Sequence, residues 1–249
     1  MLQTQKSLKS RFRAIWTSIL LTAPPQFSTR LESLIESVVD DSISSLELTD
    51  KLELSIVAIA IGAYWHQDLQ EVRSRVLALQ SRSAADIEEL VLAYAIAYGC
   101  RQEFQPQLFI NQVCHDFSKR RALSRDLESQ TRCLDRLQLA QKLVDEGAST
   151  IAAHQLDPKL DDRLSDAIAS SLYYLLSTPH SWSLITNRAQ KHNLRIAIQS
   201  GAMAAAYLGE VGEPINLDAK NYEIVKTGAL LGDKLWAIWA GVYDSNCSR

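Results

Sequence analysis

The sequence predicts an all-α protein, organised as a single multi-helix domain over residues 1–249. Apolar residues recur at intervals of three and four through most of the chain, which is the period of an amphipathic helix. The chain holds only 9 Gly and 6 Pro, so few positions interrupt a helix. No repeat, low-complexity tract or glycine-serine linker divides the chain, and its length allows one sizeable core.

Five helices are predicted in the first half, each from its own apolar stripe, at 5–22, 29–44, 52–65, 68–81 and 83–98. Pro24-Pro25 closes the first helix, and Ser28 is expected to cap the second. Aspartates near the carboxyl end of the second helix oppose the helix dipole, which hints at an earlier end. The fifth helix is expected to open with the capping box Ser83–Asp86 and to stop at Gly99.

Three further helices are predicted at 107–118, 122–146 and 161–176. Gly147 is expected to end the second of these, and the turn before Pro179 ends the third. The last elements are predicted at 222–231 and 233–243, with Trp236 and Trp239 covering one face of the core.

The stretch from Ser177 to Pro214 is the most informative part of the sequence. From Leu194 onward, small or apolar residues fall at 194, 197, 198, 201, 202, 205, 208 and 209. Such a helix has little side-chain volume, so other backbones can approach it closely on several sides. We therefore expect it to be the central helix of the domain, ended by Gly209 or Gly212 before Pro214.

The string Gly201-Ala-Met-Ala-Ala-Ala-Tyr207-Leu-Gly209, followed by Pro214, resembles the carboxy-terminal signature of the ADP-ribosylglycohydrolase family. Ser10-Arg11-Phe12-Arg13 is similar to the family's opening pattern, and His66-Gln67-Asp68 lies near an expected His-Asp pair. The resemblance implies a single orthogonal multi-helix domain. It also implies a pair of magnesium ions, held by aspartates of the turn before the signature helix and of an earlier Thr-Asp-Asp-Thr, and removal of ADP-ribose from proteins or small molecules.

This chain departs from the family at the metal ligands. The aspartate-threonine positions before Gly201 are held by His192, Asn193, Leu194 and Arg195, and a guanidinium repels a metal ion. Asp40 and Asp41 are the best remaining candidates for the earlier aspartates, and a solvated pair is the simpler interpretation. We therefore expect a shortened family member with no metal cofactor and no assigned catalytic residue. A transition-metal site of His192 with His66 or Asp68 is a weaker alternative.

Arg188, Lys191, His192 and Arg195 form a basic group just before a helix amino terminus, an arrangement that favours anions. The predicted ligand-binding residues are His192, Asn193, Arg195 and Arg188. The ligand would be ADP-ribose or a related phosphate-bearing small molecule; the alternative is an exposed basic turn. Open space between this turn and the helix over residues 50–68 would favour a ligand site, and filled space would favour a scaffold.

Three functions remain open. The first is an ADP-ribosylglycohydrolase-like protein without magnesium hydrolase activity that binds a ligand or a protein partner. The second is an active ADP-ribosyl hydrolase that uses unrecognised residues, and the third is a helical scaffold for protein–protein contact. Whether the protein is an enzyme stays uncertain, and the missing aspartates favour the answer no.

Net charge, apolar runs and cysteine spacing restrict the classes of partner and the compartment that we expect for this protein. A net charge of −3 makes nucleic acid a poor partner, and no apolar run approaches the ~20 residues of a membrane span. Residues 14–23 imitate a signal peptide, but Pro24-Pro25 is a poor cleavage context. The cysteines at 100, 114, 133 and 247 form no CxxC pair, which suits a reducing compartment. We expect a soluble, cytoplasmic protein.

Overall fold

The structure is a computed structural model that describes residues 6–42, 48, 50–80, 87–119, 127–151, 156, 167–212 and 219–242. Within these residues it contains helices and no strand, which confirms the all-α fold class. The elements are α1 (Leu8–Thr22), the 3-10 helix η1 (Pro25–Phe27), α2 (Ser28–Val39), α3 (Lys51–Tyr64), α4 (Leu69–Gln80), α5 (Ile87–Arg101), α6 (Phe109–Ser118), α7 (Leu127–Asp145), α8 (Ala167–Ser177), α9 (Trp182–Gln190), α10 (Leu194–Leu208) and α11 (Ala219–Trp239).

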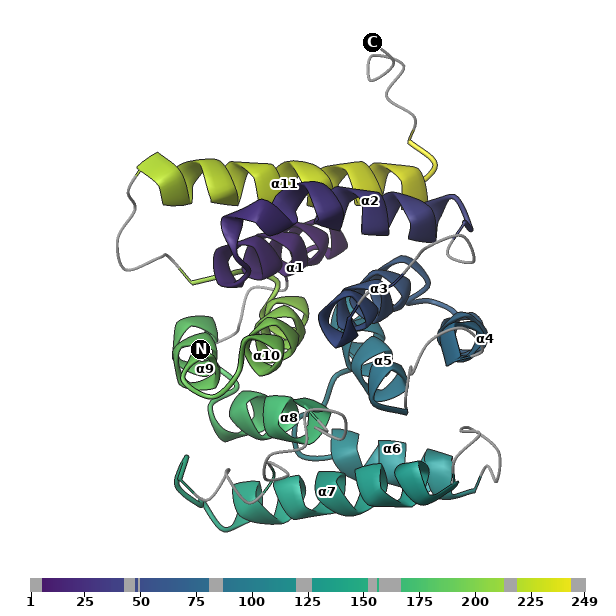
Figure 1. Ribbon diagram of the computed structural model, residues 1–249, viewed down its shortest axis with the longest axis vertical. Helices are drawn as coiled ribbons and strands as arrows, with labels where there is room; N and C mark the ends of the chain where they lie inside the picture. Colours follow the sequence, from purple (N-terminus) through teal and green to yellow (C-terminus); the bar gives the residue numbers. More distant parts are fainter. Residues whose placement is uncertain are drawn as a thin grey trace.

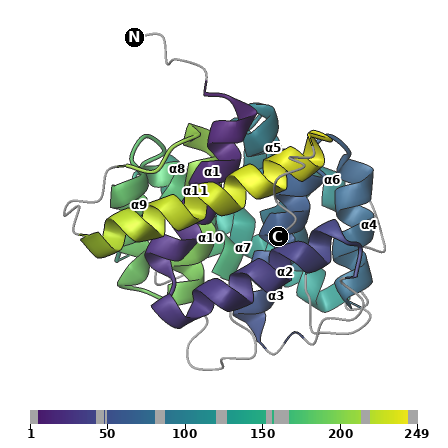
Figure 2. The same ribbon diagram turned by 90° about the horizontal axis from the view of Figure 1, so that it is seen from above.

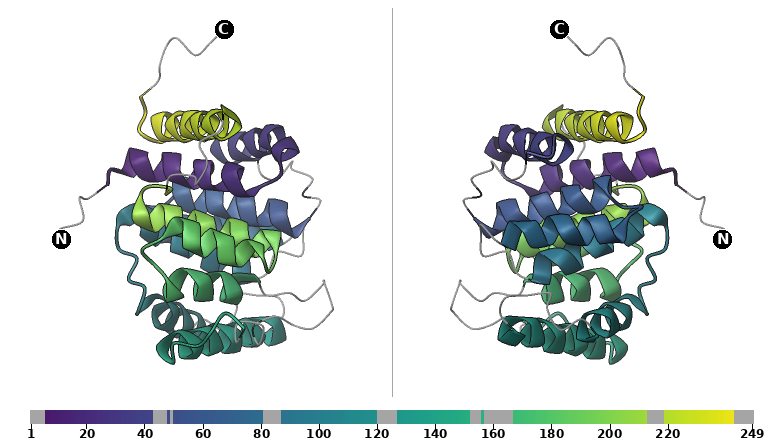
Figure 3. Two further views of the ribbon diagram at one scale, coloured as in Figure 1. Left: turned by 90° about the vertical axis from the view of Figure 1, so that its left-hand side faces the viewer. Right: turned by 90° about the vertical axis from the view of Figure 1, so that its right-hand side faces the viewer.

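The helices stack in layers whose directions differ. In Figure 1, α11 and α2 run across the top with α1 beneath them, while α6 and α7 lie at the bottom. Between these layers α9, α10, α3, α5 and α4 are seen nearly end-on, with α8 below α10. The side views in Figure 3 show these middle helices lengthwise and α11 nearly end-on, so the layers cross at steep angles. Seen from above in Figure 2, α11 crosses over α1.

Helix α10 lies at the centre of this arrangement, as its small residues predict. It packs against α1, α3, α5, α8 and α9. At Gly201 an added Cβ would lie 2.8 Å from Ser18 Oγ and 2.9 Å from Thr186 Cγ2, so only glycine permits these helices to approach so closely. Gly209 ends the helix in the left-handed conformation with φ of 73°, as predicted.

A buried arginine of α1 joins the carboxyl ends of two helices. Arg11 is only 6% exposed, and its guanidinium donates to the carbonyl oxygens of Gly99 at 3.2 Å, Ala206 at 2.5 Å and Tyr207 at 2.6 Å. Carbonyls at helix carboxyl ends lack partners within the helix and carry partial negative charge. The Arg of the Ser10-Arg11-Phe12 pattern therefore stabilises the packing of α1 on α5 and α10.

The second helix differs from its prediction at both ends. Ser28 does not cap α2; it is the first helical residue, and its hydroxyl donates to the carbonyl oxygen of Pro25 at 3.3 Å. The reason is that η1 precedes α2 directly, so Ser28 is already in helical conformation. The helix ends at Val39 rather than at residue 44, in line with the dipole argument about Asp40 and Asp41.

Two glycines that were expected to interrupt helices lie inside them. Gly99 does not stop α5, which continues to Arg101. The glycine instead makes room for α10, since an added Cβ at Gly99 would lie 2.8 Å from Ala206 Cβ. The predicted elements 222–231 and 233–243 are one helix, α11, through Gly232, where a Cβ would lie 2.5 Å from Arg13 Cα. Both glycines permit close helix contacts rather than a break.

The remaining predictions concern the core and the chain's ends. Buried apolar side chains form one continuous cluster that extends from Phe12 to Leu235, and Trp236 and Trp239 pack against it as expected. The capping box Ser83–Asp86, the start of the helix at 161–176, Pro214 and Cys247 lie outside the described residues. Among the described helices, none is long and apolar enough to cross a membrane.

Candidate functional site

The four residues predicted to bind a ligand lie around the turn between α9 and α10, but they do not face one space. Arg188 and His192 line an open hollow on the outside of this turn. Asn193 caps α10, because its side chain accepts a hydrogen bond from the backbone N–H of Arg195 at 2.7 Å. The Arg195 side chain turns into the interior, where it is only 8% exposed.

Arg195 is the centre of an interior polar cluster, which consists of Ser55, Glu88, Glu89, Ser171, Arg195 and Gln199. Its Nη2 lies 2.9 Å from Glu88 Oε2 and 2.9 Å from Glu89 Oε1, and its Nε donates to Ser55 Oγ at 3.0 Å. Gln199 Nε2 donates to the same Ser55 Oγ at 3.0 Å, and Ser171 Oγ donates to Gln199 Oε1 at 2.9 Å. The cluster thus connects α3, α5, α8 and α10 through charged and neutral hydrogen bonds.

The positions of its members follow from the helices that carry them. Glu88 and Glu89 lie in the first turn of α5, where the helix dipole favours carboxylates. Nearly every residue of α5 is buried, so both carboxylates are forced inward and require a cation. Arg195 and Gln199 are one helical turn apart on α10, so their side chains emerge on the same face toward α3 and α5.

The interior polar cluster does not fit the magnesium pair that the resemblance implies. Magnesium requires oxygen ligands in near-octahedral geometry, whereas a guanidinium group lies at this turn and donates hydrogen bonds to two carboxylates. The space between the turn and α3 is filled by side chains that bond to each other. Among the described residues, no group of three His, Cys, Asp or Glu side chains could hold a metal ion.

The other predicted metal candidates are occupied elsewhere. Asp41 forms an ion pair with Arg75 of α4, while Asp40 is exposed at the carboxyl end of α2. His66 is buried between Phe12 and Trp239, and its Nδ1 bonds to the Ala63 carbonyl oxygen at 2.8 Å. The aromatic neighbour of His192 is Tyr174, and His192 shares none of the aromatic neighbours of His66. The structure therefore does not bring the two histidines into one site.

The open hollow beside the turn, which we call the basic hollow, measures about 340 Å³. Its walls are formed by Thr150, Ile151, Tyr174, Arg188, Lys191 and His192. Arg188 lies in the last turn of α9 and Lys191 is the C-cap of that helix, so both cations project from one helix end. The Tyr174 hydroxyl and His192 Nδ1 lie 3.1 Å apart and join α8 to the turn before α10.

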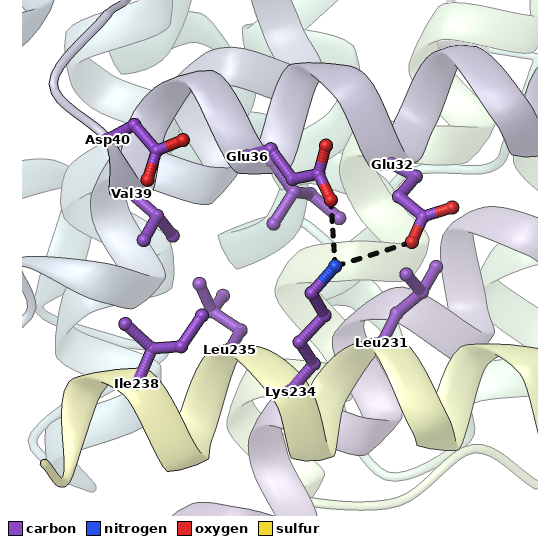
Figure 4. A pocket seen from close by; sticks show the side chains of 9 residues that line it. Glu32, Glu36, Val39, Asp40, Leu231, Lys234, Leu235 and Ile238 are labelled. Carbon is purple, nitrogen blue, oxygen red and sulfur yellow. Dashed lines mark hydrogen bonds and ion pairs between the residues drawn. The ribbon is translucent and has the colours of Figure 1, made fainter. Parts of the chain in front are cut away.

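A second hollow lies between α2 and α11, as Figure 4 shows. It measures about 160 Å³ and has an apolar floor that includes Ile35, Leu231 and Leu235. Lys234 crosses its mouth, with Nζ 2.7 Å from Glu36 Oε1 and 3.5 Å from Glu32 Oε1 (Figure 4). Lys234 and the carboxylates of Glu32 and Glu36 satisfy one another, while Asp40 adds a third carboxylate to the wall, so the described lining carries more negative than positive charge.

The cysteines offer no reactive nucleophile in the described part of the chain. Cys100, Cys114 and Cys133 are buried and form no disulfide. Burial raises the pKa of the Cys100 thiol to about 12 and that of Cys114 to about 11. Both thiols are therefore protonated at neutral pH, which agrees with the sequence-based expectation that they are inert.

Sequence reasoning missed the partners of the predicted residues. Neither Glu88 nor Glu89 was singled out from the sequence, although a helix that is apolar around most of its circumference is buried on all sides. Two carboxylates in such a helix signal a buried cation nearby, but they do not say which one. Nothing in the sequence indicated that Tyr174 would face His192.

Three comparisons with known proteins found no relative of this chain. No protein-family model matches the chain, and searches of curated proteins and of solved structures return no match.

Proposed function

We propose that this chain is an ADP-ribosylglycohydrolase-like protein that acts by binding rather than by hydrolysis. The observation that carries the proposal is the interior polar cluster around Arg195. It fills the place where the resemblance would put a metal-bound substrate, and it does so with a cation.

The electrostatics of the cluster support this proposal. A pair of divalent cations would have to displace Arg195 from Glu88 and Glu89 before any ligand oxygen could approach. That displacement would take a buried guanidinium group away from the two carboxylates that neutralise its charge, which costs several kcal/mol. The same contacts hold α3, α5 and α10 together, so the cluster has a structural role in place of a catalytic one.

The test is a hydrolase assay with magnesium present. The purified chain is incubated with mono-ADP-ribosylated protein and with small ADP-ribosylated substrates, and released ADP-ribose is quantified. We expect release no faster than in a buffer blank, while an authentic ADP-ribosylglycohydrolase in parallel confirms that the substrates are competent.

Turnover that EDTA abolishes would contradict the proposal and favour an active hydrolase with unrecognised residues. Turnover that persists in EDTA would contradict it as well, because it would require a metal-free mechanism. A helical scaffold for protein contact is the alternative within the binding class, and the filled space beside α3 favours it. The choice between these two depends on whether the basic hollow binds a ligand.

A further inference from the structure

We infer that the basic hollow is a binding site for the phosphate group of a small organic anion. The inference rests on the proposed function, since it names the ligand class of a protein that binds without hydrolysing. It differs from the arrangement expected from sequence, because Arg195 takes no part and Tyr174 does.

The first support is uncompensated positive charge. Arg188 and Lys191 both line the hollow, and within the described residues neither forms an ion pair with a carboxylate. Arginine presents a planar fork of donors that matches phosphate oxygens, and lysine adds a mobile ammonium group. Among the described residues that line the hollow, none is acidic.

The second support is a pair of polar side chains, Tyr174 and His192, that also line the hollow. The His192 ring meets the Tyr174 ring edge-on, with centroids 6.2 Å apart and planes at 88°. The Tyr174 hydroxyl and His192 Nδ1 lie 3.1 Å apart, and this contact orients both side chains. Anchored donors lose less entropy on binding than free side chains do.

The hollow lies at the turn where the carboxyl end of α9 meets the amino end of α10. His192 lies two residues before Leu194, where the 15-residue helix α10 begins. The dipole of a helix of this length carries about half a positive charge at its amino terminus. The carboxyl end of α9 brings the opposite partial charge to the same turn, so the two dipoles offset each other in part and the cations of Arg188 and Lys191 supply the attraction.

The size and rim of the hollow indicate an organic phosphate rather than a bare ion. Small-molecule sites measure about 300–1,000 Å³, and the hollow measures about 340 Å³. Ile151 on its rim is 77% exposed, and the Tyr174 ring contributes further carbon surface. A phosphate group at the cations would therefore leave room for an attached sugar or similar group beside Ile151.

The experiment is a set of titrations of the full chain, in which binding is measured by calorimetry and by ¹H–¹⁵N correlation spectra. The probes are inorganic phosphate, ADP-ribose, and adenosine as a phosphate-free control. We expect both phosphates to bind, ADP-ribose more tightly, with shifts at residues 188–194 and around Tyr174, and we expect no saturable binding of adenosine. Added salt should weaken the binding because the attraction is electrostatic.

Matched variants locate the site. Arg188→Gln with Lys191→Gln should weaken the binding of ADP-ribose by about tenfold or more, since two charge-assisted contacts are lost. Arg132→Gln with Lys142→Gln removes the same charge from exposed sites on α7 and should leave the binding within about twofold. Thermal unfolding of each variant shows whether the fold is retained. His192→Phe independently tests the contribution of the Tyr174–His192 contact to binding, which we expect to weaken.

The inference is overturned if neither phosphate binds to the wild type, or if adenosine binds as tightly as ADP-ribose. It is also overturned if the α9 pair and the α7 pair weaken binding equally. These outcomes are distinct from a failure of the proposed function, which would show itself as release of ADP-ribose in the hydrolase assay whether or not the hollow binds phosphate.

Discussion

Two arginines seven positions apart, Arg188 and Arg195, occupy opposite environments although they belong to one basic stretch of the sequence. Arg195 is buried and neutralised by two glutamates, whereas Arg188 borders an open hollow whose described lining residues include no carboxylate. The first contributes to the stability of the helix packing, and the second has a charge available for a ligand. A cluster of cations in a sequence therefore does not define one site until the direction of each side chain is known.

The two environments differ because the two arginines lie on different helices, on either side of the turn between α9 and α10. Arg188 lies in the last turn of α9 and lines the hollow together with Tyr174 of α8, while Arg195 lies in the first turn of α10 on the face that meets α3 and α5. The predictions below test this contrast between neutralised interior cations and open ones, beginning with the largest expected effect.

Substitution of Arg195 by Met should destabilise the protein by about 3–5 kcal/mol, since it leaves two buried carboxylates without their cation. Arg188→Met, the matched control in the open hollow, should change the free energy of unfolding by no more than about 0.5 kcal/mol. Denaturant unfolding curves measure both. Similar losses in the two variants would contradict the contrast.

The same variant offers a second check. Adding Glu88→Gln and Glu89→Gln to Arg195→Met removes the unpaired charges and should recover part of the lost stability. If the triple variant is less stable than Arg195→Met alone, the destabilisation does not come from uncompensated carboxylates.

Substitution of Arg11 by Met should cost about 2–3 kcal/mol, because carbonyls at the ends of α5 and α10 lose a charged donor. The neighbouring Arg13 pairs with Asp233 at the surface, and Arg13→Met should cost only about 0–1 kcal/mol. Urea unfolding of the two variants compares a buried cation with an exposed one on the same helix. An equal cost would mean that the carbonyl contacts of Arg11 contribute little.

His66 extends the comparison to a buried base without a carboxylate partner. Burial lowers the pKa of His66, and its hydrogen bond to the Ala63 carbonyl opposes this shift only in part. The unfolded chain, with a histidine pKa of about 6.5, therefore takes up the proton more readily than the folded chain. The stability that neutral His66 contributes is present above about pH 6.5 and is lost as the pH falls toward the lowered pKa of the folded state.

The measurement is the free energy of unfolding of the wild type and of His66→Gln between pH 7.5 and 5.5. The wild type should lose more stability over this interval than the variant does. Parallel slopes would show that His66 becomes protonated as easily in the folded protein as in the unfolded chain.

The smallest effect is expected at the mouth of the α2–α11 hollow. Lys234 forms exposed ion pairs with Glu36 and Glu32, and such pairs contribute about 0–1 kcal/mol. Lys234→Ala should therefore change the melting temperature only slightly, and the change should shrink further in high salt. A loss as large as that of Arg195→Met would contradict the distinction between surface and interior pairs.

The local pattern of the sequence was sufficient for most of the helices and for the central place of α10, but not for α9, which lies where an interruption between two helices was expected. The spacing of apolar residues sets which face of each helix is buried, and the small residues around Gly201 allow several helices to approach one axis. The same local signals misplaced Ser28, Gly99 and Gly232. Each of these has a role set by a neighbouring element, whereas its residue type alone suggested a cap or a break.

The candidate site was only partly predictable, because the residue types are local and their partners are not. The basic residues at 188–195 were visible in the sequence, and so was the absence of the family's aspartates. Which cation is neutralised depends on Glu88, Glu89 and Ser55, which lie between 106 and 140 positions away from Arg195. The sequence thus determined the helices and the supply of charge, and only the packing of α3, α5 and α10 decided which charge is buried and which is left open. Burial and pairing depend on contacts between distant segments, and no local pattern encodes those contacts.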